Sequence, residues 1–392
     1  MKKFLVFVLV STFLVIIGCA DKPKSLGNGL VTPSNFAEKT FTAVSDTSYN
    51  VPLMNGYSSS NLVGILPTGE KFVTLLQFYP TGATDSLNGA TIDTAEIRMI
   101  VNYRMLAPAQ PIQFDVFEVL QPFSEGTFTS DSLTTTTIGT TSIATKAFDD
   151  SMNYSQVVKA LIDTSVARRW ADDYLDTSKP NFYGFAIKAL STYGVIGFYP
   201  FNSLSATIPT LVIKFTRNGR SDSLYFTSGQ DTYAGILPVP SPFADFEVRG
   251  GTGVHSKIKF DVGSLIKPLA ERNPFPMVAN ATVTVTVDTT VSEYSGYSQD
   301  TLIAFLALPD STDDYSNTSL FAYGLKKIDS LGQRTYEFTI NAIAQSWLNN
   351  INKNEGLTIR WGAENSTREK VVFFSMSDAV KGPKLKIIYS EN

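Results

Sequence analysis

The chain of 392 residues contains one cysteine, Cys19, and one histidine, His255. A single thiol cannot form an internal disulfide, so none is expected in the fold. One histidine excludes a catalytic triad or a metal site that needs two. His255 stands at a strand start beside Lys257, which predicts a partly exposed strand residue. With so few cysteine and histidine residues, most types of nucleophilic active site and metal site are not expected.

Clusters of basic residues are also missing, and the formal net charge is -4. A nucleic-acid-binding protein would need grouped Lys and Arg to contact phosphates, so this class is not favoured. Long apolar runs are absent except for residues 4–17, which follow Lys2 and Lys3. This run is short for a spanning helix but suits a signal peptide.

The run ends in Ile16, Ile17, Gly18 and Cys19, which resembles the lipobox of bacterial lipoproteins, with Ile16 where leucine is commonest. The resemblance implies that the Cys19 thiol takes a diacylglyceryl group and that cleavage makes it the new N-terminus. Losing residues 1–18 removes two lysines and takes the net charge to -6. The alternative is an ordinary signal peptide with a chance cysteine.

The resemblance also implies a location. The residue after Cys19 is Ala20, not the aspartate associated with retention in the inner membrane. We therefore expect a lipid-anchored protein of the cell envelope, in the outer membrane if the source is Gram-negative.

One pattern occurs twice, about 175 residues apart. Near the C-terminus it comprises residues 341–347, 356–360, 371–375 and 382–389; earlier it comprises residues 164–170, 184–188, 195–199 and 208–215. The matching residues are Ala167 with Ala344, Trp170 with Trp347, Pro209 with Pro383, and Phe215 with Tyr389. A repeat of this size predicts two copies of one domain.

The chain is accordingly divided into four parts. We predict a signal peptide (1–18), a lipidated flexible tether (19–44), a first β-sandwich domain (45–217) and a second (222–392). A polar stretch with the turn-prone pair Asn218-Gly219 separates the domains.

Strand-length apolar or alternating segments, separated by Gly, Pro, Asn, Asp and Ser, fill both copies. They predict an all-β fold of two tandem antiparallel sandwiches or jelly rolls, each folding alone and each with an exposed edge at its last strand. Helical spacing is rare, and one or two turns are expected before each of Trp170 and Trp347. The predicted strands include 73–78, 95–101, 112–120, 184–188, 211–215, 255–265, 281–287 and 301–308.

The order of these elements resembles the bacterial DNRLRE domain family, relatives of carbohydrate-binding modules. The resemblance rests on residues 260–265 (FDVGSL), Ala281 opening a strand, the turn at 343–347, Gly356, and the terminal P-x-L-x-I-x-Y of 383–389. It implies a jelly-roll fold and glycan binding. The family's S-R-E stretch is replaced here by residues 375–377 (SMS). These motifs consist mostly of core and turn residues, so they support the fold more than any function.

Exposed aromatic rings are the usual platforms for sugars. The ligand-binding candidates are Tyr294, Tyr297, Tyr315 and Trp361, with Tyr49 and Tyr57 as further loop tyrosines. Local packing is the alternative for each of them. Structural roles are expected for Trp170 and Trp347, which would plug one sandwich end. The same holds for Pro209 and Pro383, which stand where the last strand starts and a missing N–H costs little.

Acidic residues leave two further options open. Glycosidases use two carboxylates, and the adjacent pairs are Asp149-Asp150, Asp172-Asp173 and Asp313-Asp314. All lie in polar contexts typical of solvated loops. Clustered oxygens at Asp310, Asp313 and Asp314 could bind calcium, although they lack the spacing of an EF-hand. No catalytic residue is assigned, and no cofactor other than calcium is considered.

The leading hypothesis is a non-catalytic, lipid-anchored envelope protein that binds polysaccharide or acts as a structural or adhesive component. One alternative is a carbohydrate-active hydrolase with two acids. Another is an assembly factor that binds an envelope protein through an exposed sheet edge.

Overall fold

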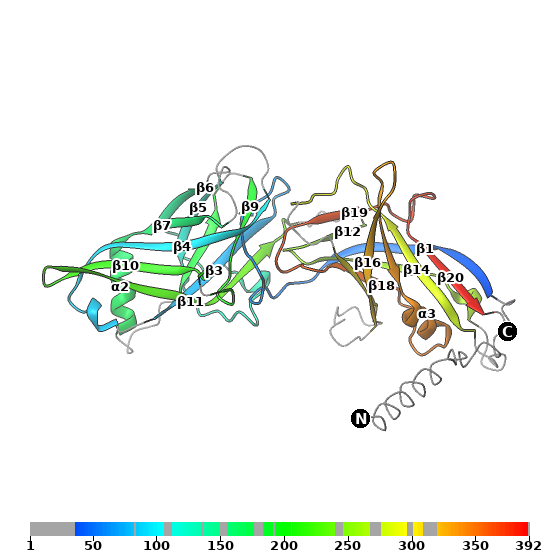
Figure 1. Ribbon diagram of the computed structural model, residues 1–392, viewed down its shortest axis with the longest axis horizontal. Coiled ribbons are helices and arrows are strands. Elements are labelled where there is room, and N and C mark those ends of the chain that lie inside the picture. Colours follow the sequence, from blue (N-terminus) through cyan, green and yellow to red (C-terminus); the bar gives the residue numbers. More distant parts are fainter. Residues whose placement is uncertain are drawn as a thin grey trace, which may run out of the picture.

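The computed structural model describes residues 36–81, 84–105, 112–134, 137–148, 155–175, 183–190, 193–204, 206–239, 246–266, 276–295, 301–308 and 320–390. Their strands form two antiparallel sheets that lie end to end (Figure 1). The predicted all-β class is confirmed. No helix in these ranges has the length and apolarity needed to cross a membrane. The predicted signal peptide and Cys19 lie outside the described residues.

The first module is the sheet of β2 to β11 together with its helix. Its strands pair in the order β11-β10-β4-β9-β2-β3-β8-β5-β6; β7 pairs with β4, and β11 also pairs with β3. Its elements are β2 (Asn61–Ile65), β3 (Lys71–Pro80), η1 (Thr84–Leu87), β4 (Thr91–Met105), β5 (Ile112–Glu118), η2 (Ser130–Ser132), β6 (Ala144–Phe148), β7 (Val157–Ile162), α2 (Thr164–Leu175), β8 (Phe185–Ala189), β9 (Gly194–Phe198), β10 (Thr210–Arg217) and β11 (Arg220–Ile236).

The second module is the sheet of β12 to β20 completed by β1. Its strands pair in the order β1-β20-β14-β17-β16-β15-β18-β13-β12-β19, and β1 also pairs with β13. Its elements are β1 (Phe36–Asn50), β12 (Phe246–Arg249), β13 (Val254–Phe260), η3 (Gly263–Leu265), β14 (Val278–Thr286), β15 (Leu302–Leu306), β16 (Phe321–Ile328), β17 (Arg334–Thr339), α3 (Asn341–Leu348), β18 (Leu357–Trp361), β19 (Lys370–Phe373) and β20 (Lys384–Ser390).

Side-chain alternation explains why these segments form strands with one buried face. In β14, Ala281, Val283 and Val285 are fully buried, whereas the threonines between them are half-buried. They point into one core together with Phe338 of the neighbouring strand β17 and Ile359 of β18. The first module has an equivalent core of its own.

The first strand does not belong to the module that follows it. β1 pairs antiparallel with β20 from Phe36↔Ser390 to Thr42↔Lys384 and then, from Ala43↔Phe260 onward, with β13, with a bulge at Val44. In Figure 1, this N-terminal strand lies among the strands of the C-terminal half. Phe41 and Ala43 thereby join the core of the second module.

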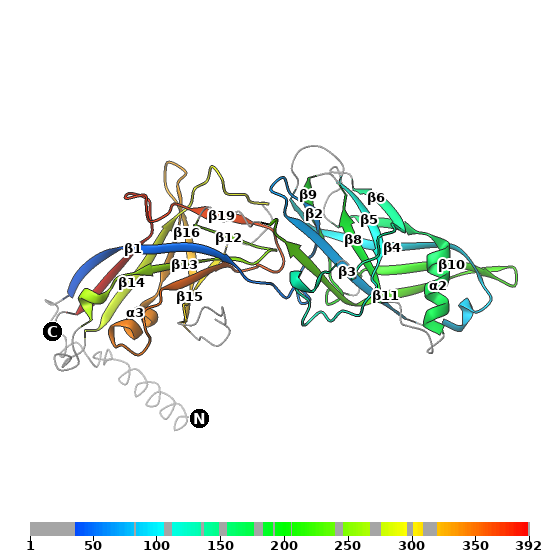
Figure 2. The same ribbon diagram turned by 180° about the vertical axis from the view of Figure 1, so that it is seen from behind.

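β11 does the same for the first module. It forms a hairpin with β10 through Asn218 and Gly219, both with positive φ, and from Phe226↔Pro80 onward it also pairs with β3, with an irregularity at Gly229. Thus β1 and β11 occupy equivalent grooves, β20–β13 and β10–β3. Figure 2 shows the two strands from the other side. We call this arrangement the strand exchange, because the opening strand of each sequence repeat completes the other module.

The strand exchange corrects four predictions, namely the tether, the bounds of each domain and the exposed edges. Residues 36–44 are not tether but strand, and residues 45–50 belong to the second module; residues 20–35 lie outside the described part. Residues 222–236 belong to the first module, not the second. The last strands are not edges, since β20 lies between β1 and β14 and β10 lies between β11 and β4.

The helices differ from prediction mainly in length. A strand followed by helix was expected before each tryptophan, and β7–α2 and β17–α3 have this form. α3 ends one residue after Trp347, but α2 continues five residues past Trp170.

The modules meet through a buried apolar contact. Phe72 and Tyr233 of the first module are fully buried, with ring centroids 6.4 Å apart. Gly251 of the second module lies against Phe72, where an added Cβ would stand 2.6 Å from the ring. Its φ of +75° also favours glycine. This glycine therefore allows the two backbones to approach.

Ion pairs are buried beside this contact. Glu70 of the first module accepts a hydrogen bond from Arg368 Nε at 2.7 Å and also pairs with Arg249, both from the second module. All three side chains are at most 2% exposed. Burial opposes ionisation of Glu70, but the two guanidinium groups outweigh it and hold its pKa below the ordinary value. The paired charges fix the relative orientation of the modules.

Two further contacts extend this interface. Tyr103 of the first module donates a hydrogen bond to the Arg368 carbonyl at 2.9 Å and accepts one from the Arg368 N–H at 3.0 Å. Nearby in the second module, His255 is fully buried and its Nε2 lies 2.6 Å from a carboxylate oxygen of Glu364. The prediction of a partly exposed histidine is wrong, because Glu364 and the Tyr49 ring pack against His255.

Candidate ligand-binding cleft

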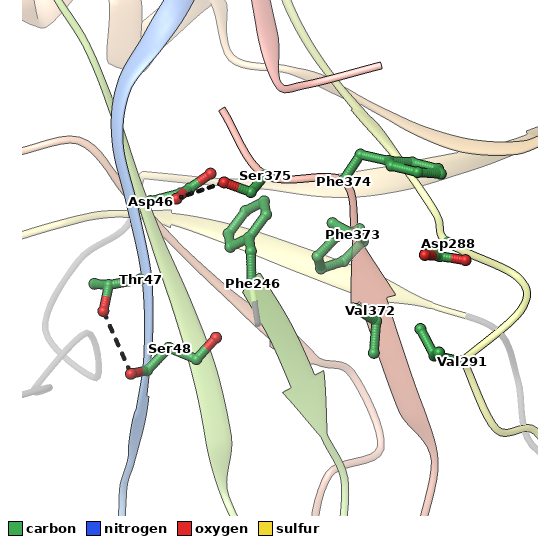
Figure 3. A pocket seen from close by; sticks show the side chains of 10 residues that line it. All are labelled: Asp46, Thr47, Ser48, Phe246, Asp288, Val291, Val372, Phe373, Phe374 and Ser375. Atoms are coloured by element: carbon green, nitrogen blue, oxygen red, sulfur yellow. Dashed lines mark hydrogen bonds between the residues drawn. The ribbon is translucent and has the colours of Figure 1, made fainter. Parts of the chain in front are cut away.

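The second module contains an open cleft of about 400 Å³. It lies over the start of β12, between β1 and β19 (Figure 3). β12 pairs with β13 only at Arg249↔Val254, so its other end diverges from β13. This local opening of the sheet creates the space. The lining residues are Asp46, Thr47, Ser48, Phe246, Asp288, Val291, Val372, Phe373, Phe374 and Ser375.

Carboxylate and hydroxyl groups form the polar part of the cleft. Asp46 accepts hydrogen bonds from Ser375 Oγ at 3.3 Å and from the Met376 N–H, so its side chain is held in one orientation. On the opposite wall, Asp288 accepts hydrogen bonds from the Thr290 N–H at 3.0 Å and from its hydroxyl at 2.6 Å. A ligand with several hydroxyl groups would find acceptors on both walls.

Aromatic rings form the apolar part. Phe246 and Phe373 are neighbours on β12 and β19, with ring centroids 5.1 Å apart. Both are nearly buried, so they make a floor rather than a protruding platform. Phe374 is half-buried at the rim, and Lys381 Nζ lies 4.4 Å from its ring centroid. The combination of an aromatic floor with fixed carboxylates is suited to a polar ring-shaped ligand.

The corresponding place in the first module is closed. Asp231 occupies the position of Asp46, and its carboxylate accepts a hydrogen bond from the Phe201 N–H at 2.7 Å, as Asp46 does from Met376. Asp231, however, is fully buried. Burial raises its pKa to about 6, although hydrogen bonds from Asn61 and Phe201 oppose the shift.

The predicted aromatic candidates that the structure describes do not line the cleft. Trp361 is fully buried and donates from Nε1 to Thr367 Oγ1 at 3.0 Å, so it cannot stack on a sugar. Tyr294 is half-buried against the core, with the Arg334 guanidinium 4.1 Å from its ring centroid. Tyr49 packs edge-on against His255, whereas Tyr57 is 67% exposed. Tyr297 and Tyr315 lie outside the described residues.

Of the predicted acidic candidates, Asp172 and Asp173 are among the described residues, and neither lines the cleft. Asp172 forms an ion pair with Arg168 on α2, with Asp173 next to it. Asp149, Asp150 and the calcium candidates Asp310, Asp313 and Asp314 lie outside the described residues. Among the described ones, no three His, Cys, Asp or Glu side chains come together as metal ligands. The carboxylates that do share a cleft, Asp46 and Asp288, carried no sequence signal.

The four residues predicted to be structural occupy matching places. Trp170 and Trp347 are 3% and 1% exposed, and Trp170 packs edge-on against Phe226 of β11 at 4.7 Å. Pro209 and Pro383 directly precede β10 and β20. Their carbonyls accept hydrogen bonds from Ser228 (2.8 Å) and Ala43 (3.1 Å) on the exchanged strands.

The sequence also did not single out an exposed aromatic row on β16. Phe321 and Tyr323 are 48% and 63% exposed and pack edge to face at 5.5 Å. Their alternation with Ala322 and Gly324 could have indicated that they face outward. This row is a second surface of the second module on which a ring-shaped ligand could rest.

A scan against protein-family models finds no match for this chain, and a search of curated proteins finds no similar sequence. The resemblance to DNRLRE domains and to lipoproteins therefore stays a prediction.

Proposed function

We propose that the protein is a non-catalytic, lipid-anchored component of the cell envelope that binds polysaccharide. The observation that carries the proposal is the cleft of the second module, with hydrogen-bonding carboxylates on two walls and an aromatic floor. A pyranose offers hydroxyl groups at its rim and apolar C–H groups on its faces, so it matches both parts. The resemblance of residues 16–19 to a lipobox supports the anchor.

The position of β1 determines how such an anchor would hold the molecule. Phe36 pairs with Ser390 at the end of the second module that is distant from the first (Figure 1). Between Cys19 and Phe36 the chain could reach at most about 60 Å if fully extended. The second module would therefore lie next to the membrane, and the first would point away from it.

A hydrolase is the second candidate, because Asp46 and Asp288 line one cleft and glycosidases act with two carboxyl groups. A purified sample that releases reducing ends from a polysaccharide, with the release lost in Asp46→Asn and in Asp288→Asn, would establish this candidate. An inactive protein that still binds would support the proposal.

The test is a polysaccharide array probed with the protein in detergent, with and without calcium. Asp46→Asn, Asp288→Asn and Phe374→Ala are expected to weaken selective binding about tenfold each. Asp222→Asn, an exposed aspartate at the other end of the molecule, is the matched control. If instead Phe321→Ala and Tyr323→Ala lose polysaccharide binding, the binding site is the exposed aromatic row on β16.

A folded protein that binds no polysaccharide would contradict the proposal. It would favour a structural role, or the assembly role in which the partner is another envelope protein. Capture of one envelope protein by cross-linking in intact cells would then separate these two alternatives.

A further inference from the structure

The first module has a groove of its own, of about 290 Å³, on the outer face of β2, β3, β5 and β8. Its floor is apolar and includes Val73 and Phe117, which are 5% and 8% exposed, and Leu190 at its border is 43% exposed. Lys71 and Lys188 also line it. The groove differs from the cleft of the second module in that its charged groups include two cations.

Lys188 is held over the floor. Its Nζ lies 4.0 Å from the centroid of the Phe117 ring, and the register places it beside Val73 on β3 and Asp115 on β5. Burial lowers the pKa of Lys188, while the nearby Asp115 carboxylate opposes that shift. Asp115 is 9% exposed and compensates part of the charge, so the groove keeps a net positive charge.

The second module repeats this cation–aromatic pair with one difference. The Arg360 guanidinium lies 5.0 Å from the centroid of Phe305, and these residues occupy the strand positions of Lys188 and Phe117. Arg360 forms an ion pair with Glu364. Among the described residues, neither Lys71 nor Lys188 has an ion pair within 4.0 Å. The second module thus holds its cation in a direct ion pair, whereas in the described part of the first module Lys188 has only the nearby Asp115 carboxylate.

We propose that this groove binds a carboxylate-bearing sugar unit, a uronate, of an acidic polysaccharide. The carboxylate lies toward Lys71 and Lys188, where a charged acceptor replaces water around the ammonium groups. The apolar face of the sugar ring rests on Val73, Phe117 and Leu190. This inference rests on the proposed function and narrows it, since it assigns an acidic ligand to the first module and leaves the aspartate-lined cleft to a neutral part of the chain.

The experiment measures binding of the full chain in detergent to alginate, polygalacturonate and hyaluronan, each beside its carboxyl-reduced form. At least one acidic polymer should bind about tenfold more tightly than its reduced form, and this preference should weaken as salt increases. The double variant Lys71→Gln/Lys188→Gln should lose the preference, and Lys71→Arg/Lys188→Arg should retain most of it.

The control is Lys159→Gln/Lys214→Gln, which removes the same charge from exposed positions on the other layer of the first module. Equal binding of every acidic and reduced pair, or loss of preference in the control as well, would overturn the groove assignment while the polysaccharide function stands. Failure to bind any form would overturn both.

Discussion

The two modules share most of their strand pairings but differ around one aspartate. Asp231 and Asp46 stand two residues after the bulge in the exchanged strand, and each accepts a backbone N–H from the segment after β9 or β19. In the first module, β4 pairs with β9 as far as Met105, and Asn61 and Glu125 lie near Asp231. In the second, β14 ends at Thr286, and Asp46 borders an open cleft.

The difference shows how one framework can serve two purposes. Both modules have the exchanged strand and its aspartate. The exchanged strand joins β10 to β3 in the first module and β20 to β13 in the second. Extending a single strand, β4, contributes to closing the space beside Asp231, whereas the shorter β14 leaves room beside Asp46. A place used for packing in one module is thereby available for a ligand in the other.

The largest effect is expected from removing the exchanged strand. Deleting residues 36–50 opens the β20–β13 groove and removes Phe41 and Ala43 from the core. The second module should lose its cooperative unfolding transition, because more than about 5 kcal/mol would be lost from a domain of ordinary stability. Calorimetry and amide hydrogen exchange would show this as loss of one transition while the first module still melts.

Deletion of residues 20–35 is the control and should leave both transitions unchanged. By the same reasoning, a fragment of residues 222–392 should not fold alone, since it lacks β1 and carries the strand that belongs to the first module. A folded monomeric fragment with native stability would contradict the strand exchange.

Breaking the buried ion pairs between the modules should be the next largest effect. Glu70→Gln leaves Arg249 and Arg368 buried without their shared carboxylate and should cost about 3–5 kcal/mol. Glu38→Gln, which removes an exposed pair with Lys386, should cost less than about 1 kcal/mol. Urea unfolding of the two variants gives the comparison.

Glu70 also makes the interface sensitive to acid. Its pKa is lowered in the folded state, so its contribution is present above the ordinary value of 4.5 and is lost as pH falls through the folded pKa. Urea midpoints measured from pH 6 to pH 3 should fall more steeply in the wild type than in Glu70→Gln. Parallel curves would contradict this role.

Asp231 should behave in the opposite way. Its folded pKa of about 6 exceeds the ordinary 3.8, so stability declines as pH rises from about 3.8 to 6 and remains lower above that. Asp231→Asn should therefore stabilise the first module by about 1–3 kcal/mol at pH 8, the upper value being the full pKa difference. Asp46→Asn, at the open position, should not stabilise the second module. If both variants stabilised their modules equally, burial would not be the cause of the difference between Asp231 and Asp46.

The smallest effect is expected at the repeated prolines. Pro209→Ala and Pro383→Ala should each destabilise their module by about 0.5 kcal/mol, because alanine increases the entropy of the unfolded chain. The carbonyls that accept from Ser228 and Ala43 remain in place. Thermal melts should show shifts of similar size, and a much larger loss at one site would indicate that the modules use these prolines differently.

Much of the local structure was predictable from the sequence. Alternation in residues such as 281–287 predicts β14, and the repeated tryptophans predict α2 and α3 with their buried rings. These features depend on neighbours within a few positions, since side-chain period and turn residues act locally. The open cleft was not predictable, because Asp46 and Asp288 are 242 positions apart and neither belongs to a motif.

The sequence by itself determined the all-β class, the twofold repeat and most strand positions. The tertiary structure alone decided which module each opening strand completes. The residues of β1 carried no signal that named their partners, which lie in β13 and β20, more than 200 residues away. Contacts between residues so far apart depend on which groove the chain can reach when the modules pack together. The buried ion pairs of Glu70 with Arg249 and Arg368 then hold the two modules in this relative orientation.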